Sequence, residues 1–194
     1  MTFLMHSPLR RLVTLGAGLF LLSSAALAAG SYTRVLPEKS SLVFVSSQMG
    51  VSVDGSFKRF SATVNFDPAM PEAGRATLDI DLASIDAGGS EANEEVKGKN
   101  WFDVKQHPTA RFVSTSVKPL GNNRYEVRGN MSIRGQTREV AAPFTLKTDG
   151  AGAVLEGSFP LKRLDYGIGS GVWGDTDVVA NEVRISFRLA VAGQ

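Results

Sequence analysis

Two aspartates, Asp79 and Asp81, are the first side chains whose type and spacing suit chemistry. On an extended strand, residues two apart share a face and lie roughly 7 Å from each other. Carboxylates at such separations act together in glycoside hydrolysis. However, the residues that alternate with them, Leu78, Ile80 and Leu82, are apolar. We therefore interpret the aspartates as the solvated face of a half-buried strand.

The segment Asp175-Thr176-Asp177 begins like a calcium-binding loop. An EF-hand loop requires glycine and a bidentate glutamate further along. Ala180 and Ser186 stand at those places, so the sequence does not predict an EF-hand. A looser ion site stays open at this segment.

His107 is the one histidine outside residues 1–28, and the chain contains no cysteine. A zinc site needs several convergent nitrogen or sulfur ligands, and a serine nucleophile is usually presented by a Gly-x-Ser-x-Gly elbow, which is absent from the sequence. We therefore predict no catalytic residue, no metal and no cofactor. His107 precedes Pro108 and is interpreted as a turn residue able to donate a hydrogen bond to a polar head group.

Residues 1–28 have the pattern of a secretory signal peptide. Arg10 and Arg11 precede an apolar run over 12–22, and small residues lead to Ala28. The run is shorter than the roughly 20 residues of a membrane span. We expect cleavage after Ala28, a periplasmic protein and one domain over 29–194.

The charge of the mature chain is balanced. The full sequence has 21 Lys plus Arg and 19 Asp plus Glu, and subtracting the two arginines of residues 1–28 leaves 19 basic residues. A neutral domain has no general field that attracts nucleic acid or an anionic membrane. Neither is predicted as a partner.

Period-two alternation of apolar and polar residues predicts an all-β fold. The predicted strands are separated by hairpin-type pairs such as Asp54-Gly55, Asn122-Asn123 and Asp149-Gly150. Eight short antiparallel strands are typical of a sandwich or an up-and-down barrel. They cover 41–48, 56–66, 77–82, 110–118, 124–133, 138–148, 153–162 and 183–191.

One interval, 90–101, favours a short helix inserted between strands. Ser90 is expected to be its N-cap, with acids in the first turn and lysines near the end. Val96, Trp101 and Phe102 would supply the buried side. Such a helix would cover one end of a barrel.

A series of short motifs follows in order along the chain. The motifs are Ser40-Ser41-Leu42-Val43-Phe44, 55–61, Phe66-Asp67-Pro68-Ala69, 82–86, Trp101-Phe102-Asp103-Val104, 107–112, 130–137, 163–169 and Asn181-Glu182-Val183. Over about 32–192, this series resembles the YceI family of secreted bacterial lipid- or polyisoprenoid-binding proteins. The resemblance implies an extended, lipocalin-like barrel of eight antiparallel strands, with the inserted helix near its mouth and a long amphiphile inside.

Two positions depart from the common pattern of that family. Lys39 stands where many members have histidine, which would make any head-group contact there cationic. The glycine-rich stretch 167–174, with Trp173, is similar to the subset associated with a membrane-bound b-type cytochrome.

The leading hypothesis is non-covalent binding, transport or storage of a polyisoprenoid, an isoprenoid quinone, or a fatty acid or its amide in an apolar cavity. Spread over nearly every strand, the aromatic residues fit either a filled core or such a cavity. The expected cavity residues are Phe44, Phe57, Ile80, Leu82, Phe112, Met131, Phe144 and Phe187. The expected mouth and head-group residues are Lys39, Lys58, Trp101 and His107.

The alternative hypothesis is an accessory interaction protein of a membrane b-type cytochrome or redox complex. In that case the barrel would be mostly filled and its loops would bind the partner. A homodimer also stays open.

Overall fold

The computed structural model describes residues 30–193. The expected signal peptide and its cleavage after Ala28 lie outside these residues. The described chain is all-β and antiparallel with one α-helix, α1 (Ser90–Lys97), as predicted. No helix within residues 30–193 is long and apolar enough to span a membrane. The strands are β1 (Tyr32–Val35), β2 (Ser41–Gln48), β3 (Val51–Phe57), β4 (Phe60–Asn65), β5 (Arg75–Asp81), β6 (Ile85–Asp86), β7 (Thr109–Gly121), β8 (Arg124–Ile133), β9 (Gln136–Asp149), β10 (Gly152–Lys162) and β11 (Glu182–Gly193).

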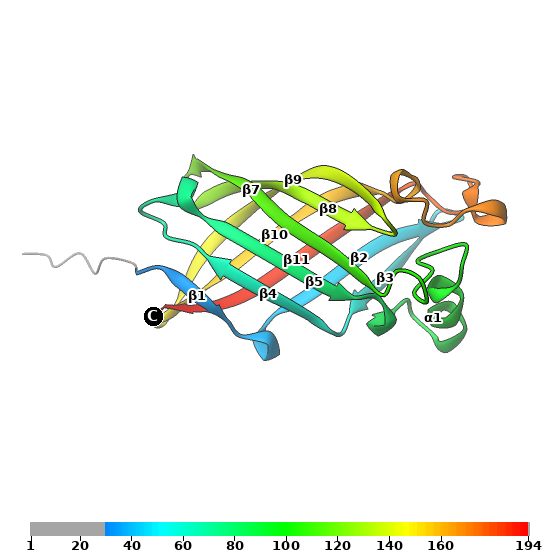
Figure 1. Ribbon diagram of the computed structural model, residues 1–194, viewed down its shortest axis with the longest axis horizontal. Coiled ribbons are helices and arrows are strands. Elements are labelled where there is room, and N and C mark those ends of the chain that lie inside the picture. The colour runs from blue at the N-terminus through cyan, green and yellow to red at the C-terminus, as the bar shows by residue number, and fades with distance from the viewer. Residues whose placement is uncertain (1–29, 194) are drawn as a thin grey trace, which may run out of the picture.

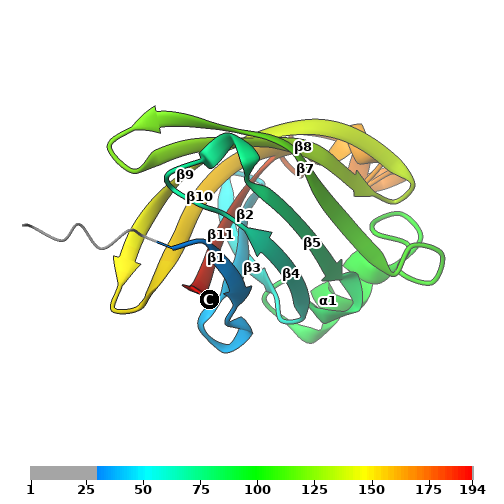
Figure 2. The same cartoon turned by 60° about the vertical axis from the view of Figure 1, so that its left-hand side comes forward.

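The strands form one curled sheet in the order β4-β5-β7-β8-β9-β10-β11-β2-β3-β6, with β1 paired beside β11. The curl brings β4 back to β1, where Tyr32 and Phe66 exchange two backbone hydrogen bonds of 2.8 and 3.0 Å. The result is an elongated barrel (Figures 1 and 2). Helix α1 lies at one end, which we call the mouth, and β1 and the C-terminus lie at the other (Figure 1).

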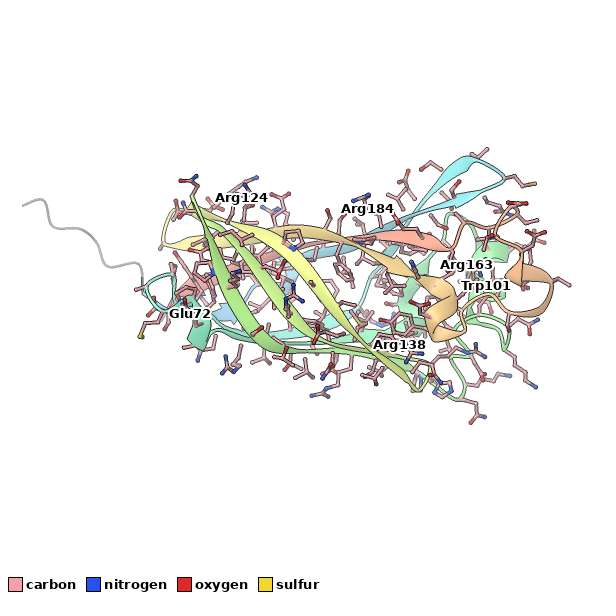
Figure 3. The ribbon with its side chains drawn as sticks, turned by 90° about the horizontal axis from the view of Figure 1, so that it is seen from above. Glu72, Trp101, Arg124, Arg138, Arg163 and Arg184 are labelled. Atoms are coloured by element: carbon pink, nitrogen blue, oxygen red, sulfur yellow. The ribbon has the colours of Figure 1, made fainter. Side chains whose placement is uncertain are left out.

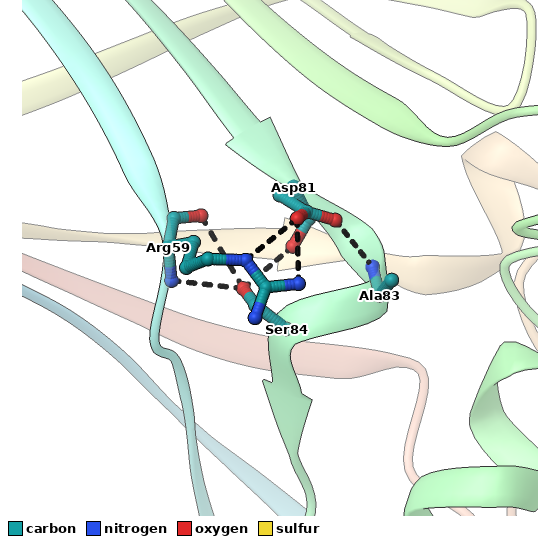
Figure 4. Close-up of polar contacts among 4 residues, drawn as sticks. All are labelled: Arg59, Asp81, Ala83 and Ser84. Atoms are coloured by element: carbon teal, nitrogen blue, oxygen red, sulfur yellow. Dashed lines mark hydrogen bonds and ion pairs between the residues drawn. The ribbon is translucent and has the colours of Figure 1, made fainter.

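At the mouth, a group of polar contacts ties the start of β4 to the 3-10 turn Leu82–Ser84 after β5 (Figure 4). Asp81 accepts hydrogen bonds from the Arg59 Nε at 2.9 Å and from the Ala83 backbone N–H at 2.9 Å. The Ser84 hydroxyl accepts from the Arg59 backbone N–H at 2.9 Å and donates to the Asp81 carbonyl at 2.6 Å. These bonds hold the start of β4 beside the turn that leads into β6, so the two end strands of the sheet meet here.

The interpretation of Asp79 and Asp81 as an outward face is confirmed. Asp79 pairs with Arg111 at 3.2 Å and Asp81 with Arg59 at 2.7 Å, and all four side chains are at least one-third exposed. Exposed pairs of this kind contribute little to stability, about 0–1 kcal/mol each. The residues that alternate with them face the inside of the barrel.

The strand count exceeds the eight predicted, since the described residues contain eleven strands. β1 and β6 have four and two residues, too few to show alternation. The expected strand 56–66 is two strands, β3 and β4, separated by Lys58 and Arg59.

Two local predictions are wrong. Asp54-Gly55 is not a turn but lies inside β3, and the hairpin turns instead at Met49-Gly50, with φ of 48° and 78°. Gly89, not Ser90, is the N-cap of α1, without a side-chain hydrogen bond, and the helix ends at Lys97 rather than 101.

Three aromatic rings close the end of the barrel opposite the mouth, and we call them the floor. Phe66 packs edge-on against Tyr125 and Phe144, with ring centroids 5.0 and 5.7 Å apart. Tyr125 and Phe144 stack at 5.2 Å. All three residues are buried, and burial raises the pKa of Tyr125.

Candidate functional site

The barrel contains an outer chamber of about 770 Å³ beneath the mouth. Its wall comes from the inward-facing residues of β2, β3, β8, β10 and β11. Helix α1 and the segment after it cover the chamber at the mouth. Apolar side chains dominate the wall. The polar side chains on it, which include Ser46, Gln48, Glu95 and Arg163, belong to the strand ends and the cover.

An inner chamber of about 110 Å³ lies deeper in the barrel. It shares Leu42, Ile80, Met131 and Ile185 with the outer chamber, so the two adjoin each other. Floor residues Phe66 and Phe144 line it as well. The barrel is therefore hollow from the mouth towards the floor. The alternation of apolar and polar residues in the sequence fits a hollow and a filled barrel equally, so it did not predict this.

All eight residues expected in the cavity lie on its wall. Phe44, Phe57 and Leu82 line the outer chamber, and Ile80 and Met131 line both. The three remaining residues line the inner chamber: Phe112, Phe144 and Phe187.

Of the four expected mouth residues, the structure brings only Trp101 to the cavity wall. Lys39 is exposed in the 3-10 turn before β2. Lys58 pairs with Asp86 at 3.1 Å on the outside, and the pKa of Asp86 is lowered mainly by the Gly88 backbone N–H and then by Lys58. His107 lies beside Gly135 in the segment leading to β7.

Arg163, which sequence reasoning did not assign to the site, is the most buried polar residue of the mouth, with 2% of its surface exposed. Its Nε donates to the Ala180 carbonyl at 3.0 Å, and its two terminal nitrogens donate to four further carbonyls at 2.7–2.9 Å. Those four belong to Ile168, Gly169, Trp173 and Val179. Every guanidinium N–H is thus used, since arginine has five.

No ion pair among residues 30–193 involves Arg163, so its charge is balanced only by carbonyl dipoles. Burial lowers its pKa from the usual value, but a guanidinium keeps its proton at ordinary pH. Its Cζ lies 5.8 Å from the centroid of the Trp101 ring, and Figure 3 shows the two side by side near the mouth. The mouth therefore carries a fixed positive centre beside an aromatic face.

The loop 163–181 wraps around this guanidinium. At Gly169, φ is +75°, and a Cβ there would overlap the Arg163 Nη1, so the close approach of loop and side chain requires glycine. A glycine-rich loop that turns its carbonyls inward needs a buried donor to satisfy them. An arginine directly before such a loop was the signal that sequence reasoning could have used.

The cap of the barrel consists of two segments, 87–108 and 163–181, that are joined by polar contacts. The Trp173 Nε1 donates to the Glu95 Oε1 at 2.7 Å, and the Ser170 backbone N–H donates to the Asn100 carbonyl at 2.7 Å. Arg134 adds hydrogen bonds to the carbonyls of Lys99 and Gly167. The side-chain bonds Trp173–Glu95 and Arg134–Lys99 are exposed to solvent, so the junction between the two segments opens more readily than the barrel strands.

Removing one of these contacts should loosen the cap without unfolding the barrel. In Glu95→Leu the Trp173 N–H loses a charged acceptor, and we expect amide hydrogen exchange over 171–179 to become about tenfold faster. Glu95→Gln keeps an acceptor and should change the rate much less. Unchanged exchange in Glu95→Leu, measured by mass spectrometry, would show that this bond does not hold the cap.

The Trp101 indole Nε1 is buried and has no hydrogen-bond partner among the described residues. A buried donor without an acceptor is costly, about 1–3 kcal/mol. The Trp101 ring also packs on Trp173, with centroids 5.6 Å apart. The mouth thus holds one donor that an oxygen atom from elsewhere would satisfy.

The arrangement suits binding of an elongated apolar molecule. Within residues 30–193 no group of three or more His, Cys, Asp or Glu side chains is placed to hold a metal ion. The wall offers apolar surface along its whole depth, and most of its polar side chains line the outer chamber. The fold and site define a capped antiparallel β-barrel with an apolar lumen.

The family follows from sequence comparison. The model of the YceI-like domain matches residues 34–191, so the chain belongs to the YceI family. A UPF0312 protein of Azotobacter vinelandii is 31% identical over 169 residues, which cover 82% of this chain and 87% of the relative.

Solved structures show the same fold. Burkholderia cenocepacia BcnA is 44% identical, with a TM-score of 0.79 over 81% of this chain and 99% of BcnA. A polyisoprenoid binding domain from Saccharophagus degradans, implicated in plant cell wall breakdown, is 17% identical. It has a TM-score of 0.65 over 85% of this chain and 99% of that domain, and at this identity the likeness concerns the fold alone.

Proposed function

We propose that the protein binds a long amphiphile non-covalently and carries or stores it in the barrel lumen. The observation that supports this most is the pair of adjoining apolar chambers between the mouth and the aromatic floor. Burial of an aliphatic tail contributes about 0.8 kcal/mol per CH₂ group, so a long tail binds tightly without specific polar contacts.

The tail would lie towards the floor and the head group at the mouth. The inner chamber is lined by apolar side chains apart from Arg75 and Thr77, whereas Arg163 and the unpaired Trp101 N–H lie at the outer end. A positive centre and a hydrogen-bond donor together favour a head group with oxygen acceptors. An alcohol, a quinone carbonyl, a carboxylate or an amide has this chemistry.

The candidate ligands are a polyisoprenoid, an isoprenoid quinone, or a fatty acid or its amide. The Saccharophagus degradans domain of the same fold is described as polyisoprenoid-binding, which supports the first of these. We further propose that the protein acts in the periplasm, on the pattern of residues 1–28.

The alternative, an accessory protein of a membrane redox complex, expects a barrel that is mostly filled. A lumen with an outer chamber of about 770 Å³ favours the carrier instead. Binding rather than catalysis is the activity that the apolar wall supports.

The direct test is native mass spectrometry of the protein purified from its own periplasm, followed by solvent extraction and identification of lipids. We expect a stoichiometric prenyl, quinone or acyl species. The proposal would be contradicted if the purified protein contains no bound lipid and binds none of geranylgeraniol, a ubiquinone and palmitate when exposed to them. Recovery from the cytoplasmic fraction alone would contradict the proposed location.

A further inference from the structure

Three glycines interrupt the rows of side chains that face the lumen. They are Gly55 in β3, Gly129 in β8 and Gly157 in β10. Their neighbours two positions away, such as Val53 and Phe57, line the chambers. Glycine inside a strand weakens it and often marks a close approach of another group. Each of these positions therefore needs a physical reason.

In all three cases the reason is a phenylalanine ring from an adjacent strand. A Cβ at Gly55 would come within 2.5 and 2.6 Å of Phe44 ring carbons. At Gly129 a Cβ would stand 2.6 Å from the Phe112 ring, and at Gly157 it would stand 2.7 Å from the Phe187 ring. The rings thus occupy the space that side chains at the glycines would fill, and they lie against the barrel wall.

Gly55 differs from Gly129 and Gly157 in the atoms that an added Cβ would contact. A Cβ at Gly129 or Gly157 would also overlap a backbone carbonyl, that of Val113 or Pro143. At Gly55 the three nearest atoms all belong to the Phe44 ring. The nearest obstacle to a side chain there is therefore a ring, which can rotate away from the wall.

The Phe44 ring stands at the outer chamber. Phe44 and Gly55 are directly paired in the β2–β3 register, and Phe44 and Phe57 both line the chamber, with ring centroids 5.7 Å apart. Phe57 in turn packs edge-on against Phe102 of the cap at 6.1 Å. A ring displaced from Gly55 has β3 and Phe57 on its wall side, so the free direction is the lumen.

We propose that the Gly55–Phe44 pair sets the width of the outer chamber and so determines how bulky a tail the lumen admits. The inference rests on the proposed function and assigns a specificity-determining residue to it. With glycine at 55 the ring lies flat and leaves room for methyl branches along a chain. With any larger residue at position 55 the displaced ring narrows the outer chamber. The narrowing reduces binding of a branched chain more than binding of a linear one.

The test compares geranylgeraniol with hexadecanol, a linear alcohol of equal main-chain length, by calorimetric titration. For Gly55→Ala we expect the affinity for geranylgeraniol to fall about tenfold and that for hexadecanol by less than about threefold, on the usual scale of overpacking. Adding Phe44→Ala to Gly55→Ala removes the displaced ring and should restore geranylgeraniol binding. Gly193→Ala is the matched control, because Gly193 lies in β11 at the end opposite the mouth and its Cβ would approach no atom closer than 3.8 Å.

An equal loss for both alcohols, or no rescue by Phe44→Ala, would overturn the proposal. Crystals under xenon pressure separate it from the proposed function, because xenon occupies apolar cavities whatever the natural ligand is. Wild-type protein that binds neither alcohol contradicts amphiphile binding, and the width of the chamber is then judged by xenon alone. Xenon should occupy the outer chamber of the wild-type protein, and its occupancy should be lower in Gly55→Ala. Equal xenon occupancy in both proteins would overturn the role of Gly55.

Discussion

Phe112→Asp should reduce binding of geranylgeraniol by about 100-fold or more, because a carboxylate in an apolar chamber must be desolvated by the bound tail. Phe112 lines the inner chamber from β7, and its ring lies over Gly129. The same desolvation raises the pKa of the introduced carboxyl above that of a free aspartate. Binding should therefore recover in part as the pH falls and the carboxyl becomes neutral, and it should be lost again as the pH rises.

Val113→Asp is the control for that experiment. Val113 is the next residue of the same strand, but it points outwards and is 41% exposed. Its substitution should leave binding near the wild-type value at every pH. Equal binding by folded Phe112→Asp and wild type in calorimetric titration, with circular dichroism to verify folding, would refute the assignment of Phe112 to the tail site.

Arg163→Met should lower the free energy of unfolding by about 3–5 kcal/mol, a loss typical of leaving buried partners uncompensated. Five carbonyl oxygens of the cap lose their donor at once, and methionine fills much of the volume but donates nothing. We expect the loop 163–181 to lose its order first, so that amide exchange there accelerates more than in the barrel strands. Urea denaturation gives the global value.

Arg163→Lys distinguishes the charge from the geometry. An ammonium keeps the positive charge but offers three donors from a single atom, so it cannot reach all five carbonyls. The Arg163→Lys variant should therefore lose roughly half as much free energy of unfolding as Arg163→Met. A loss below about 1 kcal/mol in Arg163→Met would show that the cap does not depend on this side chain.

The lumen wall could be predicted from the sequence because a strand exposes alternate residues to opposite faces. Phe112 and Phe187 needed only that local rule to be placed inside. Gly55 misled the same reasoning, since a glycine after an aspartate is typical of a hairpin turn. Its real role depends on the ring of Phe44 in the neighbouring strand, which no local pattern reveals.

The mouth was harder to predict for a related reason. Arg163 bonds to carbonyls up to 17 residues further along the chain, and carbonyls carry no residue-type signal. Lys58 has the type of a head-group contact, but the fold turns it outwards to Asp86. Polar residues at strand ends thus take their direction from tertiary contacts, whereas apolar residues within strands take theirs from the alternation.

The two tryptophans of the chain, Trp101 and Trp173, both stand at the mouth, with their rings 5.6 Å apart. Trp101 lies next to the guanidinium of Arg163, and Trp173 is bonded to the carboxylate of Glu95. Tryptophan dominates the ultraviolet emission of a protein, so the light that this chain emits comes from its entrance. The unmodified protein therefore carries its own optical reporter, which responds when a molecule passes the entrance and is insensitive to changes at the far end of the barrel.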